Sequence, residues 1–174
     1  MAARCPTTGD VCFVPALLGL GTPLWDFGAR GTLIGLTRGT GRPEVVRAVL
    51  EGIAHRGADL LEAAEHDAAT SVPALRVDGG MSANPVFVQA LADACGVPIE
   101  LSRELEATTL GAGLLAGVAL GWWRDAAEAA ATALPRSVVE PGITADDRAA
   151  KRARWLTARA RAERTIPELS EIHF

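Results

Sequence analysis

The chain has 174 residues, 49% of them hydrophobic and 22% charged, so it must bury a core and is not a disordered tail. Seventeen basic and 21 acidic residues give a net charge of −4, which leaves no overall basic surface for nucleic acid. Three cysteines without a CxxC pair argue against a disulfide framework or zinc module, and the longest apolar run, 110–123, is too short to span a bilayer. We therefore expect a cytoplasmic protein with no nucleic-acid or membrane partner.

Two short strands and a loop are predicted at the start of the chain. Residues 1–10 carry turn formers and are expected to be unstructured. Residues 11–18 and 31–37 are short, largely apolar stretches that predict strands. Between them, residues 19–30 hold three glycines and a proline without a regular period, which predicts a loop.

A long helix is predicted from Pro43 to about residue 66. Proline fits the first turn of a helix, and Glu44 places a negative charge at the positive end of the helix dipole. Apolar residues between Val46 and Ala64 recur at helical spacing, whereas most charged residues fall elsewhere on the helical wheel. The pattern therefore indicates a helix with one face in the core.

The middle of the chain alternates between predicted strands and helices. Residues 74–77 and 97–102 predict strands, and Asn84 provides an N-cap for a helix that continues through Cys95. A third helix is predicted over 105–123, where several glycines would let another backbone approach closely or would mark a buried central helix. This alternation predicts an α/β layer with parallel strands.

About forty residues at the end of the chain are expected to form two helices joined by a polar connection. Residues 125–133 predict an alanine-rich helix, and residues 135–144 the connection. The last predicted helix, 146–164, carries a run of basic residues that could bind an anionic partner. We favour the simpler interpretation, a solvated surface helix anchored by Trp155 and Leu156.

The best candidate for a binding site is Asp78-Gly79-Gly80, placed between a predicted strand and the helix capped by Asn84. Glycines let a backbone come close to a ligand, and a helix N-terminus offers free N–H groups and positive partial charge. Such a turn suits a nucleotide at the carboxyl end of a sheet. An ordinary tight turn explains the same residues equally well.

Other reactive side chains favour structural roles. Asp26 and Asp78 lie beside glycines at predicted element ends, where a carboxylate can act as a general base but more often caps its own backbone. His55 and His66 lack neighbouring ligand residues, so we expect surface or capping roles for them. The cysteines have no activating neighbour and are interpreted as buried thiols.

A longer pattern fits the second signature of the FGGY carbohydrate kinase family. Ten residues match it at the required spacing: Gly31, Leu33, Gly35, Leu36, Glu44, Val45, Ala48, Val49, Leu50 and Glu51. Residues 19–26 and 35–40 resemble the glycerol kinases of this family more than its xylulose or gluconate kinases. The resemblance covers about residues 11 to 165 and points to the carboxyl-terminal half of such a kinase.

The resemblance implies an actin-like ATPase built from two ribonuclease-H-like α/β domains, with ATP in the cleft between them. Residues 76–80 with Asn84 match the family's adenosine motif, so Gly80 and Asn84 would contact the nucleotide while Gly79 and Met81 shape its pocket. Residues 107–112 match the second interdomain connection, which places Thr109, Gly111 and Ala112 on a hinge helix.

The family's catalytic aspartate, phosphate loops and glycerol contacts lie upstream of the matched part. We therefore expect an incomplete domain, without its first strands and without the whole amino-terminal domain. Residues 11–134 would form the nucleotide-side domain, and 135–174 a connection and basic helix packed on it. The cofactor would be ATP or ADP with Mg²⁺, the metal held mainly by the missing half.

The resemblance implies that the chain is the ATP-binding half of an enzyme converting ATP and glycerol to ADP and glycerol 3-phosphate. It would be inactive alone and would bind glycerol only with the amino-terminal half. The apolar face of the helix 105–123 would then bind a complementing amino-terminal chain or a second copy of this chain. Two alternatives stay open: a degenerate, non-catalytic nucleotide-binding or interaction module, and half of another FGGY sugar kinase.

Overall fold

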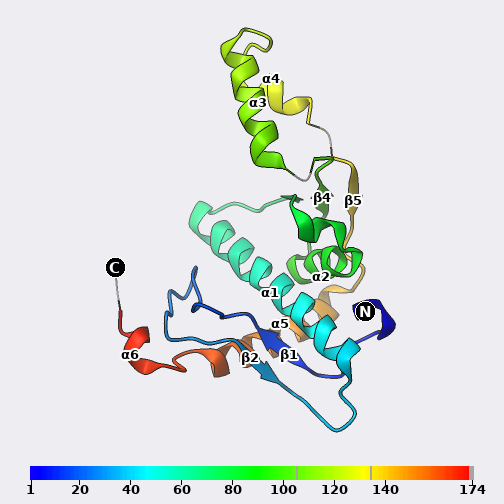
Figure 1. Cartoon of the computed structure of the whole chain (residues 1–174), viewed down its shortest axis with the longest axis vertical. Helices are drawn as coiled ribbons and strands as arrows, with labels where there is room; N and C mark the ends of the chain where they lie inside the picture. Colours follow the sequence, from blue (N-terminus) through cyan, green and yellow to red (C-terminus); the bar gives the residue numbers. More distant parts are fainter. Residues whose placement is uncertain (105, 134, 173–174) are drawn as a thin grey trace.

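The computed structural model describes residues 1–104, 106–133 and 135–172. Its elements in chain order are η1 (Ala2–Arg4), β1 (Cys12–Val14), β2 (Thr32–Ile34), α1 (Arg42–Ala68), β3 (Leu75–Val77), η2 (Gly80–Ala83), α2 (Pro85–Cys95), β4 (Ile99–Leu101), α3 (Ala107–Ala119), α4 (Ala126–Ala131), β5 (Ser137–Val139), α5 (Ala145–Ala162) and α6 (Pro167–Ser170). Most of these elements gather in one body, from which α3 and α4 project as an arm (Figure 1).

The strands form two small sheets rather than one layer of parallel strands. β1 pairs antiparallel with β2. β3 and β4 run parallel, and β5 joins β4 in the antiparallel direction. The expectation of parallel strands is therefore correct only for β3 and β4, the pair joined through helix α2, because a parallel pair needs such a crossover.

Strand β5 corrects the sequence analysis, which assigned residues 135–144 to a polar connection. Val139 lies opposite Ile99 and Ser137 opposite Leu101, so the segment is an edge strand. Two of its three residues are exposed, and three residues are too few to display the alternation typical of a strand. The strand exists because the edge of β4 offers backbone partners to it.

Helix α1 begins and ends within about two residues of the prediction. The Gly41 N–H donates to Glu44 Oε2 at 2.9 Å, and Pro43 lies in the first turn, so both start signals act as expected. The helix ends at Ala69, whose φ of 49° is left-handed. Gly52 lets α1 lie directly on β1, since a Cβ there would overlap the Phe13 carbonyl oxygen.

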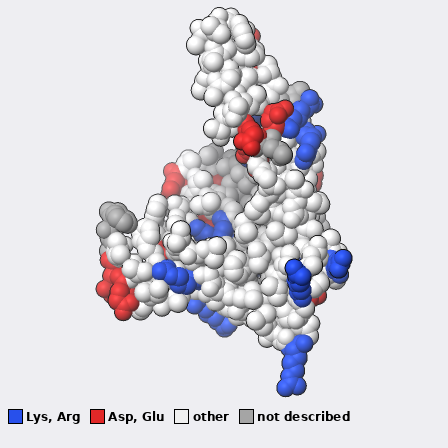
Figure 2. Space-filling view, viewed as in Figure 1, with Lys and Arg blue, Asp and Glu red and all other residues white. Residues whose placement is uncertain are grey.

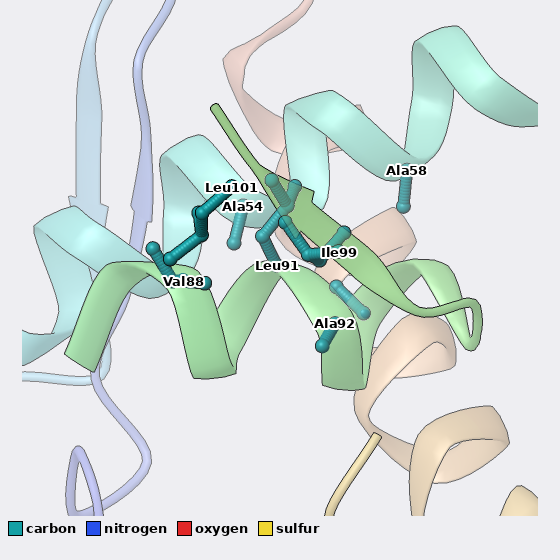
Figure 3. Packing of buried hydrophobic residues seen from close by; sticks show 8 residues of the cluster. Ala54, Ala58, Val88, Leu91, Ala92, Ile99 and Leu101 are labelled. Carbon is teal, nitrogen blue, oxygen red and sulfur yellow. The ribbon is translucent and has the colours of Figure 1, made fainter. Parts of the chain in front are cut away.

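One hydrophobic core lies between α1, α2 and β4 (Figure 3). Small residues on α1 allow close packing: a Cβ added to Gly57 would lie only 2.6 Å from Leu91 Cδ1. Helix α2 begins and ends where the sequence predicts, at the Asn84 N-cap and at Gly96, whose backbone is left-handed. The buried members of the cluster are Ala54, Ala58, Val88, Leu91, Ala92, Ala94, Ile99 and Leu101.

A second core lies where α5 covers the β1–β2 sheet and the loop between its strands. Trp155 of α5 is 2% exposed and packs with Val14 and Leu20. The loop is held by Asp26, whose Oδ1 accepts from the Gly28 N–H at 2.9 Å and whose Oδ2 accepts from the Arg164 N–H at 2.7 Å. Asp26 therefore has the structural capping role expected from the sequence.

A buried carboxylate joins α1 to α5. Asp59 Oδ1 lies 2.8 Å from Arg152 Nη2 and 3.1 Å from Arg159 Nη1, while Oδ2 lies 2.8 Å from Arg56 Nη1. The Trp155 indole N–H also donates to Oδ1 at 3.2 Å. Burial acts to raise the pKa of Asp59, but the arginine hydrogen bonds and charges outweigh it and hold the pKa below its usual value.

This cluster changes the interpretation of α5 as a simply solvated helix. Trp155 is an anchor as predicted, but Leu156 is 40% exposed and is not one. The second anchor is Arg152, which is buried and also bonds Glu62 Oε2 at 2.7 Å and the His55 carbonyl oxygen at 3.1 Å. A basic residue in a basic run looked solvent-facing because its acidic partners are about ninety residues away in sequence.

His55 is not a surface residue. Its ring stacks on Trp155 with centroids 5.4 Å apart, and burial together with the Arg152 charge lowers its pKa to about 4. Of the three cysteines expected to be buried, only Cys5 is; Cys12 and Cys95 are half-buried, and desolvation raises the pKa of both thiols, that of Cys95 to about 11.

The two ends of the expected domain also differ from the sequence analysis. The first ten residues, expected to be unstructured, include η1, and both Ala2 and Cys5 are buried. The third helix covers 107–119 rather than 105–123. Leu105, where the predicted helix begins, lies outside the described residues, as do Leu134 and residues 173–174.

The arm is apolar and exposed, so α3 is not a buried central helix. Residues 107–123 contain no charged side chain, and most of the arm is white in Figure 2. Leu115 and Trp122 are 62% and 70% exposed. Gly117 is covered by the Trp123 ring, whereas a Cβ at Gly113 would meet no atom within 4 Å. Within the described residues, no helix is long and apolar enough to cross a membrane.

Removing the Asp59 carboxylate should destabilise the chain strongly. In Asp59→Ala, Arg152 would keep only Glu62 and Arg159 only Glu163 as acidic partners, so positive charge beside the core would lose its buried counter-charge. Such a loss typically lowers the free energy of unfolding by roughly 3–5 kcal/mol. Urea unfolding followed by circular dichroism measures this free energy of unfolding. Arg154→Gln is the matched control, since its pair with Asp10 is exposed and should contribute no more than about 1 kcal/mol. Equal losses in both variants would contradict the role of Asp59.

Stability should also fall as the pH drops from about 6.5 towards 4. The unfolded chain protonates His55 near pH ~6.5, whereas the folded chain does so only near about 4. The unfolded state therefore binds more protons in this window, and folding loses roughly 2–3 kcal/mol by pH ~4.5. His55→Phe keeps a ring against Trp155 without a titrating group, so its unfolding free energy should change less between pH ~7.5 and ~4.5. Parallel losses in both proteins would refute this assignment.

Candidate functional site

The site predicted from the sequence lies at the carboxyl end of β3. The chain leaves β3 at Val77, turns through Asp78 and Gly79 into η2, and enters α2 at Asn84. Gly79 has φ 81° and ψ 176°, a conformation that only glycine adopts without strain. This turn places the exposed residues Gly80 and Met81 at the end of the β3–β4 sheet.

Hydrogen bonds within the turn hold it rigidly. The buried Ser82 donates its hydroxyl to the Gly79 carbonyl oxygen at 2.7 Å. Asn84 Oδ1 accepts from the Val86 N–H at 3.1 Å and the Phe87 N–H at 3.4 Å, as an N-cap should. The sequence analysis did not assign Ser82 to this turn. Its place three residues after Gly79 could have indicated it, because there both its N–H and its hydroxyl bond the Gly79 carbonyl oxygen.

The two glycines differ in what they require. At Gly79 the backbone itself demands glycine, whereas Gly80 has an ordinary φ and a Cβ there would meet no atom within 4 Å. The chain would thus tolerate a side chain at Gly80 sterically. The open space beside Gly80 is where a ligand can approach the backbone closely.

The arm begins beside this turn. Asp78 Oδ2 accepts from the Ala107 N–H at 3.1 Å, which ties the end of β3 to the first residue of α3. Asp78 thus has a structural contact, but with the backbone of α3 rather than, as the sequence analysis expected, with its own turn. A cavity of about 260 Å³ opens between the ends of β3 and β4 and the arm, and it is lined in part by Asp78, Ser102 and Gly111.

Of the predicted hinge-helix residues, only Gly111 lines this cavity; Thr109 and Ala112 are exposed on α3. The structure therefore brings one hinge residue to the same strand ends as the Gly79–Asn84 turn. Such strand ends are the usual place for ligands in open α/β sheets. Among the described residues, no three His, Cys, Asp or Glu side chains come together as a metal site.

Comparison with known proteins identifies the family. The C-terminal domain of the FGGY family of carbohydrate kinases matches residues 1–120, which include the turn and the start of the arm. The chain belongs to the FGGY family of carbohydrate kinases. The family resemblance inferred from the signature residues and the 76–84 motif is thereby confirmed.

Glycerol kinases are prominent among the similar proteins. Glycerol kinase 2 of Thermotoga maritima is 44% identical over 162 residues, 93% of this chain and 33% of that protein. The glycerol kinase of Trichlorobacter lovleyi is 53% identical over 128 residues, 74% of this chain and 26% of that protein. The chain thus spans about a quarter to a third of the length of these relatives.

Solved structures confirm the expected fold class, an actin-like, ribonuclease-H-like α/β domain. The crystal structure of Plasmodium falciparum glycerol kinase with ADP superposes with a TM-score of 0.83 at 31% identity, covering 99% of this chain and 33% of that one. Xylulose kinase from Lactobacillus acidophilus superposes with a TM-score of 0.73 at 32% identity, covering 92% and 32%.

Proposed function

We propose that this chain is the ATP-binding domain of a glycerol kinase, which transfers the γ-phosphoryl group of ATP to glycerol. One observation carries the proposal: eight curated glycerol kinases are 40% to 53% identical to the chain, most of them over about nine-tenths of its length. The solved relative from Plasmodium falciparum was crystallised with ADP. The open backbone at Gly80 supports a nucleotide site at the equivalent place here.

In this proposal the turn after β3 binds the adenosine end of the nucleotide. Gly79 sets the backbone direction, Gly80 lets the nucleoside approach, and Met81 covers it. Asn84 fixes the start of α2 next to this turn. These residues bind and orient, which suits phosphoryl transfer, a reaction accelerated mainly by positioning and by neutralising charge.

ATP would supply the transferred phosphoryl group, with Mg²⁺ on its phosphates. We assign the general base, the phosphate loops and the glycerol contacts to the part of such a kinase that precedes the matched segment. The arm carries the residues assigned to the hinge, Thr109, Gly111 and Ala112, and the uncharged surface of residues 107–123 would face that part. Glycerol would accordingly bind only when both parts are together.

A different FGGY substrate is the second candidate. Gluconate kinase from Lactobacillus acidophilus superposes with a TM-score of 0.72 at 32% identity, close to the value for the xylulose kinase. The curated glycerol kinases at 40% to 53% identity and the higher TM-score of the solved glycerol kinase, 0.83, favour glycerol. Assays of this chain combined with the preceding part of such a kinase, with glycerol, xylulose and gluconate side by side, distinguish the three substrates.

Nucleotide binding should depend on Gly80 without a matching change in stability. In Gly80→Val the side chain would fill the space proposed for adenosine, so calorimetry should show at least about tenfold weaker ATP binding. The midpoint of urea unfolding should change little, because the added atoms meet nothing in the chain. Gly79→Val is the contrasting variant: its strained backbone should lower stability by roughly 1–3 kcal/mol. ATP binding as tight in Gly80→Val as in the parent chain would exclude this site.

Residues 1–174 alone should not phosphorylate glycerol. A coupled assay with ATP, Mg²⁺ and glycerol should show turnover only after addition of a second polypeptide, the part of the Thermotoga maritima kinase that precedes the matched segment. Gly80→Val in the same mixture is the control, and it should reduce the restored activity. Turnover by the purified chain alone that survives repurification would refute the proposal.

A further inference from the structure

A hollow where α1, α2 and α5 meet is separate from the nucleotide site. Its volume is about 270 Å³, and a second hollow of about 350 Å³ lies beside it and shares Glu51, His55 and Lys151. Neither is lined by any residue of the Gly79–Asn84 turn. The first hollow combines charged side chains with an apolar wall that includes Val86 and Ala90.

The carboxylates around this hollow already have partners. Glu51 Oε1 accepts from Arg47 Nε at 2.7 Å, and Arg47 Nη1 also donates to the Cys5 carbonyl oxygen at 2.8 Å. Asp93 Oδ1 accepts from Gln89 Nε2 at 2.9 Å and from a backbone N–H at 2.7 Å. These acidic groups are therefore engaged by other donors.

Two cations on the opposite wall have no such partner. Arg148 and Lys151 lie three residues apart on α5 and hence on one face of the helix. In the part of the chain that the structure describes, neither side chain makes an ion pair or a hydrogen bond. The Arg148 guanidinium lies against the backbone of Gly96, at the carboxyl end of α2, where a Cβ would overlap it.

A buried polar atom lies in the same wall. His55 Nδ1 is inaccessible to solvent and has no hydrogen-bond partner within the described residues. Burial and the nearby positive charges of Arg152 and Lys151 lower the pKa of His55, so the ring is neutral at pH ~7 and carries one N–H. The ring therefore adds no positive charge to the wall of the hollow at pH ~7.

We propose that this hollow binds the phosphate group of a small phosphomonoester, with Lys151 and Arg148 as its charge partners and the His55 ring as part of its wall. Guanidinium and ammonium groups are the side chains best suited to phosphate oxygens. The apolar wall suits a short carbon chain. A volume just below the ~300–1,000 Å³ of drug-sized sites fits a small ester rather than a nucleoside triphosphate.

Calorimetric titration of the chain with sn-glycerol 3-phosphate, inorganic phosphate and glycerol tests the proposal. No nucleotide is present, so the result does not depend on the proposed ATP site. The ester should bind about tenfold more tightly than inorganic phosphate, and glycerol should not bind. Lys151→Gln and Arg148→Gln should each weaken ester binding by about tenfold, the usual effect of losing one charge-assisted hydrogen bond.

Arg161→Gln is the matched control, because it removes the same charge from an exposed residue of α5 outside this hollow. Its affinity for the ester should stay within about twofold of the parent value. The His55 ring signals in the NMR spectrum should shift on titration in the parent chain but not in Lys151→Gln. Circular dichroism establishes that each variant is folded, and Lys151→Arg should restore most of the binding.

Three results would overturn the proposal. Absence of ester binding by the folded parent chain excludes the site. An equal loss in Arg161→Gln means that general charge attraction, not this hollow, binds the ester. Equal affinity for inorganic phosphate and the ester removes the assignment to a phosphomonoester.

Discussion

The placement of the two sheets depends on the buried carboxylate of Asp59. No backbone ladder joins the β1–β2 sheet to the β3–β4–β5 sheet in the described residues, so helices must fix one against the other. Helix α1 packs on both β1 and α2, and α5 also packs on β1 and on α2. Asp59 of α1 connects these two helices through Arg152, Arg159 and the Trp155 indole N–H of α5, while Arg56 of α1 pairs with its other oxygen. A buried charge is tolerated here because every oxygen is matched by a donor.

Local signals in the sequence were sufficient for the long helices. Glu44 and Asn84 bond the backbone groups that such caps usually bond, and Gly96 ends α2 as predicted. Long-range partners were not visible in the same way. The acidic partners that allow Arg152 to be buried lie in α1. Residues 137–139 form strand β5 only because they pair with the edge of β4. Neither feature follows from the spacing of nearby residues, because both depend on which distant segments meet.

The candidate site shows the same division between local and distant information. A glycine pair before a capped helix was ambiguous in the sequence, since a ligand site and a plain turn use the same residues. The structure separates the two roles: backbone geometry accounts for Gly79, but nothing in the chain itself accounts for a glycine at Gly80. The contact from Asp78 to the start of α3 could not be predicted, because it joins residues almost thirty positions apart.

The uncharged surface of residues 107–123 in the arm has a physical consequence for any contact it makes. The nearest charges on the arm are Arg124, Asp125 and Glu128, of which Arg124 and Asp125 pair with each other, so long-range electrostatics would contribute little to attraction at this surface. Association through Leu115 and Trp122 would therefore be nearly independent of ionic strength, and it would weaken on cooling, as apolar burial does. Its partner would be selected by shape, since the open backbone at Gly113 admits only a closely fitting surface. The body of the molecule, where most of the charges lie, would set solubility instead.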